Sequence, residues 1–196
     1  MDMKERHFYA FLSRMKYINR WGLMRNTRTE NIQEHSYEVA VLAHALALIS
    51  NRYFGGSYDP GKTCLYALFH DANEIITGDL PTPVKYFNPE IKESYGRLEE
   101  LSKERLLDML PEEFRPDYRP LLFYEREAPA YIALVKAADK LSAYIKCIEE
   151  VKAGNSEFKK ARAATKSAVE EMELPAAQYF MENFIEAYGL SLDELD

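Results

Sequence analysis

The amino-acid sequence predicts an all-α fold, with about seven or eight helices in a single domain that spans residues 1–196. Apolar residues recur every three or four positions over most of the chain, which is the period of a helix with one buried face. Segments rich in Gly, Pro and Asn separate these stretches. No segment alternates apolar and polar residues as a half-buried strand does, so a helical bundle is expected.

The first three helices are expected over residues 5–18, 33–52 and 62–76. In the first, Phe8, Phe11 and Met15 share one helical face. The second is rich in Ala, which has the best helix propensity. The third ends at Thr77-Gly78, because Gly commonly follows the last helical residue. Residues 19–31 between the first two helices hold Gly, Asn and Thr and indicate an ordered loop, and residues 53–61 indicate turns.

The second half of the chain begins with residues 79–89, whose three prolines exclude a regular helix. Residues 90–110 return to the helical period, and Pro111, Pro116 and Pro120 divide the following stretch into short helices. A long helix is expected over residues 130–153 and stops at Gly154-Asn155. Two further helices are expected over residues 156–171 and 175–188.

Composition limits the classes of function. The formal net charge is −7, from 25 basic and 32 acidic residues, which argues against a nucleic-acid polymer as a partner. No apolar run approaches the roughly 18 residues of a membrane span, and the N-terminus lacks the apolar core of a signal peptide. Cys64 and Cys147 form no metal-binding or disulfide motif. We therefore expect a cytoplasmic enzyme that does not bind membranes.

Basic residues are concentrated near the N-terminus. Residues 1–30 hold seven Lys or Arg residues and only three acidic ones. Most of these basic side chains are expected on a solvated face. One or two of them are candidates for an anion site, since Arg and Lys bind phosphate groups.

The adjacent pair His70 and Asp71 is the first candidate for chemistry. It follows the apolar run CLYALF, where a carboxylate is costly unless it is paired or binds a cation. Both side chains can reach one ion that lies between them. The alternative is an ion-paired Asp beside a core His. His7 and His44 are expected to be ordinary surface or core residues, and His44 lies on roughly the opposite helical face from His35.

Two further acids strengthen the metal interpretation. Glu74 follows His70 by four residues, so on a continuous helix it shares the same face and is a candidate general acid or base. Asp139 has apolar neighbours, which indicates partial burial. Together with His35, His70 and Asp71, it supplies two imidazoles and two carboxylates. Such a set leaves coordination positions open for water or a phosphate oxygen.

This order of residues, His35, then His70-Asp71, then Asp139, resembles the HD-domain phosphohydrolase superfamily. A more specific resemblance extends over nearly the whole chain, to the bacterial YfbR-type 5′-deoxynucleotidases. It is carried by the segments INRWGLMRNTRTENIQEHS, LFHDANEIITGDLPTPVKYFN and KAADKLSAYIKCIEE, and by the ending SLDEL. The fold implied by the resemblance is a single HD-domain helical bundle.

The resemblance implies a role for each matching position. The implied metal ligands are His35, His70, Asp71 and Asp139. Arg20 and Glu74 are the implied catalytic residues, and Arg20 orients the substrate phosphate. Trp21 is implied to contact the sugar and to disfavour a 2′-hydroxyl. The implied substrate-binding residues are Arg20, Trp21, His35, Asp71, Asp79, Leu80, Pro81, Thr82 and Asp139.

The expected reaction is metal-dependent hydrolysis of a deoxyribonucleoside 5′-monophosphate to the deoxynucleoside and phosphate. The expected cofactor is one divalent metal ion, such as Co or Mn, because this ligand set accepts several metals. The resemblance also implies a homodimer, which the aromatic C-terminal residues Tyr179, Phe180, Phe184 and Tyr188 would support unless they complete the core. The alternatives are a triphosphohydrolase or cyclic-nucleotide phosphodiesterase of the same superfamily, and a non-catalytic nucleotide-binding helical module.

Overall fold

The computed structural model describes residues 6–85 and 87–195, and within these ranges the chain is largely helical, as predicted. The one β-type pairing in the described ranges joins Asn19 and Asn31 and closes the loop between the first two helical segments. Residue 5, the expected start of the first helix, lies outside the described residues. No helix in these ranges has both the length and the apolar character needed to cross a membrane.

The first helical segment is shorter than predicted. Helix α1 (Phe8–Leu12) passes directly into a 3₁₀ segment, η2 (Ser13–Tyr17), instead of continuing as one α-helix. Phe8 is fully buried and anchors this segment. The loop of residues 18–31 then leads to the longest helix.

Helix α2 (Ile32–Tyr53) begins where the Asn31 side chain accepts hydrogen bonds from the backbone N–H groups of Gln33 and Glu34, each at 3.0 Å. Its bounds lie within one residue of those predicted at either end. Val39 and Leu46 are fully buried on its inner face, as the apolar period predicted. Burial of this face, more than helix propensity, stabilises such a helix in a folded domain.

Helix α3 (Pro60–Phe69) starts with Pro60 in its first turn, and the Asp59 side chain caps it. The prediction of one continuous helix over residues 62–76 is wrong after Phe69. The backbone N–H groups of His70, Ala72 and Glu74 each donate to the carbonyl three residues earlier, so residues 70–73 form tight turns. The short helix α4 (Glu74–Thr77) follows. Gly78, with φ of 73°, ends it as predicted.

The Pro-rich segment contains one helical turn, α5 (Thr82–Lys85), where no regular helix was predicted. Helix α6 (Pro89–Leu107) is capped by Asn88. The prolines beyond it accompany the predicted short helices. These are η3 (Glu112–Phe114), α7 (Arg115–Leu122), α8 (Tyr124–Glu127) and η4 (Pro129–Tyr131).

The long helix α9 (Ile132–Lys152) matches the prediction closely, and Gly154, with φ of 87°, follows its end. The remaining elements are η5 (Ser156–Phe158), α10 (Lys159–Glu170), α11 (Pro175–Asn183), η6 (Ile185–Gly189) and η7 (Leu192–Glu194). Among the described residues, seven α-helices have eight or more residues: α2, α3, α6, α7, α9, α10 and α11. The predicted all-α architecture is confirmed.

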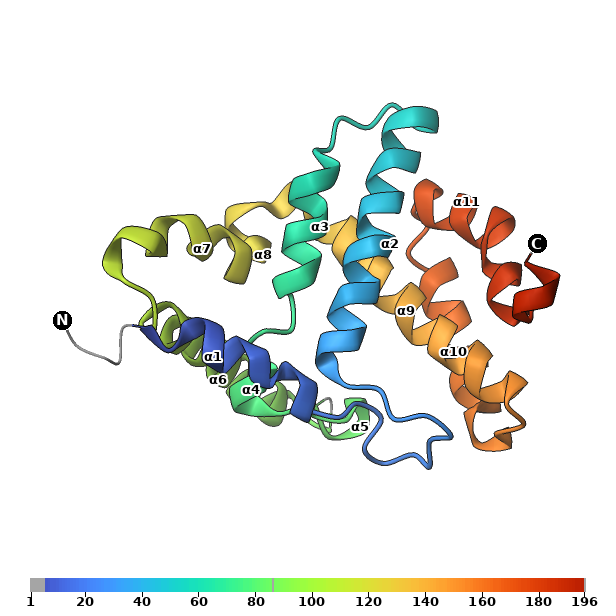
Figure 1. Cartoon of the computed structure of the whole chain (residues 1–196), viewed down its shortest axis with the longest axis horizontal. Coiled ribbons are helices and arrows are strands. Elements are labelled where there is room, and N and C mark those ends of the chain that lie inside the picture. The colour runs from blue at the N-terminus through green and yellow to red at the C-terminus, as the bar shows by residue number, and fades with distance from the viewer. Residues whose placement is uncertain (1–5, 86, 196) are drawn as a thin grey trace.

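Helix α2 lies at the centre of the molecule. Figure 1 shows α2 and α3 side by side, with α9 passing across them and α11 beyond α2. Their inner faces form the larger apolar core. A second apolar cluster joins residues of α1, α6 and α7, including Phe8 and Leu106. The N-terminal end of α2 and the C-terminal end of α3 lie at the same end of this pair, near α4.

A buried polar network fixes the loop of residues 18–31 to the end of α9. Glu150 is 1% exposed. It accepts hydrogen bonds from the Thr27 backbone N–H at 2.9 Å, the Thr27 hydroxyl at 2.6 Å and Asn155 at 2.8 Å. Lys146 Nζ donates to Glu150 at 2.5 Å and to the Arg28 carbonyl at 2.6 Å. A buried ion pair with its remaining hydrogen bonds satisfied is costly to disrupt.

Substituting Glu150 with Gln is predicted to destabilise the fold, because it leaves the Lys146 ammonium buried without a counter-charge. We expect a loss of about 3 kcal/mol in the free energy of unfolding, measured by urea denaturation at pH 7. The control is Glu149→Gln, the same change at the exposed neighbouring position. It should shift stability by less than about 0.5 kcal/mol.

The stability difference between wild type and Glu150→Gln should depend on pH, because it depends on the charge of the Glu150 carboxyl group. Burial alone would raise the pKa of Glu150, but hydrogen bonds from Lys146, Thr27 and Asn155 hold it well below its usual range. The stabilisation is therefore complete above the ordinary pKa of about 4.3 and is lost as the pH falls below it. The stability difference between wild type and Glu150→Gln should shrink below that pH. A difference that is constant from pH 7 to pH 3 would contradict this account.

Candidate metal centre

Two imidazole rings meet where α2, α3 and α9 converge. His35 lies in the first turn of α2 and is fully buried. His70 directly follows α3, and its side chain is 8% exposed. The ring centroids are 5.3 Å apart. The helix ends thus bring together two histidines separated by 35 positions in the sequence.

Two carboxylates approach the same ring atoms. Asp71 Oδ2 lies 3.0 Å from His70 Nε2 and 3.5 Å from His35 Nε2. Asp139 Oδ1, from α9, lies 3.1 Å from His35 Nε2. Ligand atoms of His35, His70 and Asp71 all lie within 4.8 Å of one another. Three of the four residues predicted as metal ligands therefore gather at one point, and Asp139 adjoins them through His35.

The hydrogen bonds of the rings fit a metal site. His70 Nδ1 lies 2.6 Å from the Ala67 carbonyl oxygen, which can only accept, so Nδ1 carries a proton. His35 Nε2 and His70 Nε2 are both buried without a hydrogen-bond partner among the described residues. Metal-binding histidines commonly donate from the second ring nitrogen to a carbonyl or carboxylate. The donor set, two imidazoles and two carboxylates, suits a divalent transition metal.

The electrostatic field at this point favours positive charge. Burial alone would lower the pKa of His70, but the adjacent Asp71 carboxylate raises it to about 9. The histidines in turn overcome the effect of burial on Asp71 and hold the pKa of its carboxyl well below the usual value. The same field attracts a divalent cation.

Glu74 lies at the start of α4, one turn beyond Asp71, and is 9% exposed. Its Oε2 atom is buried without a hydrogen-bond partner in the described chain. Burial, reinforced by the negative charges of Asp71 and Asp79, raises the pKa of Glu74 to about 10. The tight turns over residues 70–73, rather than the continuous helix predicted, bring Glu74 to this position. A buried carboxyl with a raised pKa suits proton transfer.

Arg20 approaches the cluster from the loop of residues 18–31. Its Nη1 donates to Glu30 Oε2 at 2.8 Å and lies 2.8 Å from His35 Nδ1. Its side chain is 13% exposed. Within the described ranges, the hydrogen bonds of the Arg20 side chain use Nη1 alone, which leaves Nη2 and Nε as donors for an anion.

Trp21 is held in an unusual backbone conformation. Its φ of 60° lies in the left-handed region, which bulky residues rarely adopt and which costs of order 1–3 kcal/mol. The indole Nε1 donates to Glu30 at 2.9 Å, and the ring packs against Phe158 at a centroid distance of 5.4 Å. The ring is therefore fixed beside Arg20. Such strain is often found at functional sites.

Asp79 follows Gly78 and is linked to the same loop. Burial raises the pKa of its carboxyl, whereas Arg20 and the Trp21 backbone N–H oppose this effect. Leu80, Pro81 and Thr82 continue the chain from Asp79 towards α5. Their assignment to a nucleotide pocket stays a prediction.

The two histidines expected to have ordinary roles do not join the cluster. His44 is exposed on α2, and His7 precedes α1 and is also exposed. Cys64 and Cys147 are both free, as predicted.

Three residues near the cluster were not identified from the sequence. Glu30 joins Arg20 to Trp21, and Ser142 and Glu38 lie behind His35. Ser142 follows Asp139 by three residues, and Glu38 follows His35 by three, so each shares a helical face with a candidate ligand. This spacing of three residues was the signal from which Ser142 and Glu38 could have been identified in the sequence.

Solved structures with the same fold define the class. An HD-domain phosphohydrolase from Listeria innocua matches with a TM-score of 0.79 and 24% identity, over 93% of this chain and 88% of that one. The HD phosphohydrolase of cyanophage S-2L, solved with dA and one catalytic Zn²⁺, matches with a TM-score of 0.64 and 22% identity, over 90% and 95%. The fold is that of the HD-domain phosphohydrolases.

Sequence comparison gives the particular family. The model of the 5′-deoxynucleotidase YfbR-like family matches residues 7–188. A relative named 5′-deoxynucleotidase from Shewanella oneidensis is 52% identical over 190 residues, which cover 97% of each chain. The chain belongs to the 5′-deoxynucleotidase YfbR-like family, and the resemblance seen in the sequence is confirmed.

The cluster predicts one site per chain for a divalent metal ion, which Zn²⁺ can probe. Asp71→Asn should weaken Zn²⁺ binding by at least about 100-fold, since changes even behind the ligands typically cost 10- to 100-fold. Competition with a chromophoric chelator measures this affinity. The control is His44→Ala, an exposed histidine on the same helix as His35, which should bind Zn²⁺ as wild type does. Equal loss in both variants, or in neither, would contradict the site.

Proposed function

We propose that this chain hydrolyses deoxyribonucleoside 5′-monophosphates to the deoxynucleoside and phosphate, with one divalent metal ion, as a single HD-type domain over residues 1–196. The observation that carries the proposal is the convergence of His35 Nε2, His70 Nε2 and the Asp71 carboxylate beside Glu74, whose Oε2 atom has no hydrogen-bond partner among the described residues. The family membership supports it, because its relatives are named 5′-deoxynucleotidases. The cyanophage neighbour, which binds dA and Zn²⁺, is consistent with it.

The residues that would hold the ion are His35, His70, Asp71 and Asp139. A bound divalent ion would neutralise phosphate charge and lower the pKa of water near the phosphorus atom. Cobalt and manganese are the metals we propose first. Phosphate binding, proton transfer and sugar selection are proposed for side chains of this chain.

Arg20 is proposed to bind the phosphate through Nη2 and Nε, while Glu30 accepts from its Nη1 atom. A guanidinium group offers two parallel donors to two phosphate oxygens, and its charge persists throughout the reaction. Glu74 Oε2 is the proposed proton-transfer atom for the attacking water or the leaving 5′-oxygen. Its burial beside the carboxylates of Asp71 and Asp79 raises its pKa to about 10, which suits a group that holds and transfers a proton.

Trp21 is proposed to exclude the 2′-hydroxyl of ribonucleotides. Its ring is fixed by Glu30, by Phe158 and by the left-handed backbone, and so cannot readily yield to an additional oxygen. Asp79, Leu80, Pro81 and Thr82 are proposed to line the nucleotide pocket. Neither assignment favours one base over another.

The chelator-stripped protein, resupplied in turn with Co²⁺, Mn²⁺, Mg²⁺ or Zn²⁺, should release phosphate from dAMP and little from AMP. Glu74→Gln should lower kcat by about 10²- to 10⁴-fold, the usual contribution of a positioned proton-transfer group. Its Zn²⁺ affinity should stay near that of wild type. Hydrolysis of dATP or a cyclic nucleotide in place of dAMP would favour the rival activities of the superfamily, and hydrolysis of none would favour the non-catalytic module.

The preference for deoxyribose over ribose can be tested by substituting Trp21. Trp21→Ala should raise the rate with AMP relative to dAMP by about 10-fold or more, the scale on which one group in a pocket is discriminated. Phe158→Leu, which replaces the ring behind the indole with a smaller aliphatic side chain, should give a smaller change. Unchanged selectivity in Trp21→Ala would remove the sugar-contact role and leave the phosphatase activity in place.

We further propose that the protein is a cytoplasmic homodimer. Phe180 is 6% exposed and completes the core, whereas Phe184 is 45% exposed beside it. Leu190 and Leu195, 41% and 56% exposed, lie around the same apolar surface. Sedimentation equilibrium should give a mass of twice the 22.8 kDa chain, and a concentration-independent monomer mass would contradict the dimer.

A further inference from the structure

Ser142 connects the candidate metal centre to a second carboxylate. It lies on α9 one turn after Asp139 and is fully buried. Its Oγ atom is 3.0 Å from His35 Nδ1 and donates a hydrogen bond to Glu38 Oε2 at 2.5 Å. The three groups therefore form a chain, from Glu38 through Ser142 to the imidazole of His35.

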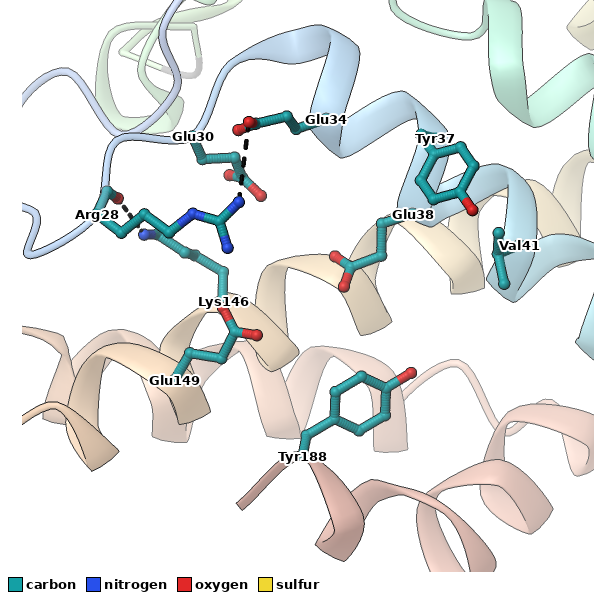
Figure 2. A pocket seen from close by; sticks show the side chains of 9 residues that line it. All are labelled: Arg28, Glu30, Glu34, Tyr37, Glu38, Val41, Lys146, Glu149 and Tyr188. Carbon is teal, nitrogen blue, oxygen red and sulfur yellow. Dashed lines mark hydrogen bonds and ion pairs between the residues drawn. The ribbon is translucent and has the colours of Figure 1, made fainter. Parts of the chain in front are cut away.

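Glu38 lies on α2 one turn after His35 and reaches this chain from there. Figure 2 shows its carboxylate extending from α2 towards α9, opposite Tyr188. It forms part of the wall of a pocket of about 400 Å³ whose lining includes none of the four candidate ligands. Glu38 is therefore positioned to act on the centre through Ser142.

The donors and acceptors in this chain favour one tautomer of the His35 ring. A hydroxyl has one proton, and Ser142 gives that proton to Glu38. Ser142 Oγ can then only accept from His35, so this contact favours the imidazole proton on Nδ1. In that tautomer the lone pair of neutral His35 is on Nε2, which lies 3.1 Å from Asp139 and 3.5 Å from Asp71. We propose that Ser142 and Glu38 are positioning residues that fix the metal-binding tautomer of His35.

Arg20 lies beside the same nitrogen, His35 Nδ1, and favours the opposite tautomer. Its Nη1 lies 2.8 Å from His35 Nδ1, and a guanidinium group only donates. Arg20 therefore favours an unprotonated Nδ1 with the proton on Nε2, a state that cannot bind a metal. Ser142 and Glu38 oppose that preference. The tautomer of His35 consequently depends on a balance between side chains.

His70 shows why this role is assigned to His35 alone. Its Nδ1 faces the Ala67 backbone carbonyl, which no side-chain substitution removes. For His35, the corresponding acceptor is a serine hydroxyl that points correctly only while Glu38 takes its proton. Mutation of either residue should change the ring state without touching a ligand. The inference rests on the proposed metal-dependent function, because it requires that His35 bind the ion.

The test is Zn²⁺ affinity, measured by competition with a chromophoric chelator on the full chain. Ser142→Ala and Glu38→Leu should each weaken Zn²⁺ binding by about 10- to 100-fold, the usual effect of losing the partner behind a ligand histidine. Glu38→Gln keeps an amide oxygen that accepts from Ser142, so it should retain most of the affinity. Circular dichroism should show the same helix content in all three variants.

The matched control is Ser36→Ala. Ser36 is 1% exposed and lies next to His35 on α2, and its hydroxyl has no hydrogen-bond partner among the described residues. Ser36→Ala removes a hydroxyl oxygen, as Ser142→Ala does, from an equally buried position, and it should leave Zn²⁺ affinity within about twofold of wild type. A comparable loss in Ser36→Ala would show a general packing effect and overturn the proposal.

A second readout reports the ring directly. The chain has four histidines, so long-range ¹H–¹⁵N NMR spectra can resolve the tautomer of His35. Wild type should show Nδ1 protonated, and Ser142→Ala should shift His35 towards protonation at Nε2. This shift is expected from loss of the hydrogen-bond chain and not from a simple loss of packing.

The outcomes separate the two proposals. A wild-type protein that binds no Zn²⁺ would overturn the metal centre and this inference together. Wild-type binding with equal affinity in Ser142→Ala, or with an unchanged His35 tautomer, would overturn the role of Ser142 and leave the centre intact. Weakened binding with a shifted tautomer, and normal binding in Ser36→Ala, is the result the geometry predicts.

Discussion

The burial of two imidazole nitrogens against two carboxylates constrains the rest of this structure. His35 Nε2 and His70 Nε2 are buried and face the carboxylates of Asp71 and Asp139 at 3.0–3.5 Å. A cation bound by both nitrogens would pair the charges of Asp71 and Asp139. Helices α2, α3 and α9 must meet at this point with their apolar faces packed, because each supplies or adjoins a ligand.

The loop that carries Arg20 and Trp21 shows a similar relation between stability and function. The left-handed backbone of Trp21 is unfavourable in isolation. The Asn19–Asn31 pairing joins the two ends of the loop, and hydrogen bonds from Thr27 to Glu150 hold its middle. The ion pair of Lys146 and Glu150 thus helps to hold the loop that carries Arg20 and Trp21.

The sequence predicted the parts of this molecule that depend on local pattern. The long apolar period of α2 and α9 gave their bounds closely, and the spacing of His70, Asp71 and Glu74 indicated a shared site. The break after Phe69 could not be predicted, because the apolar run there suits a continuous helix and does not indicate the tight turns around His70. Glu30, Ser142 and Glu38 were missed for a different reason. Ser142 meets its partners across more than 100 positions, and Glu30 meets Arg20 through loop geometry that no period reveals.

The central claim is that His35, His70, Asp71 and Asp139 hold one metal ion. The most direct test is anomalous X-ray diffraction from a crystal of the Zn²⁺-loaded protein. The proposed centre predicts one strong peak about 2.0–2.2 Å from His35 Nε2, His70 Nε2 and carboxylate oxygens of Asp71 and Asp139. A crystal that contains zinc elsewhere, with His35 Nε2 turned away from the peak or bonded to a carboxylate instead, would contradict it.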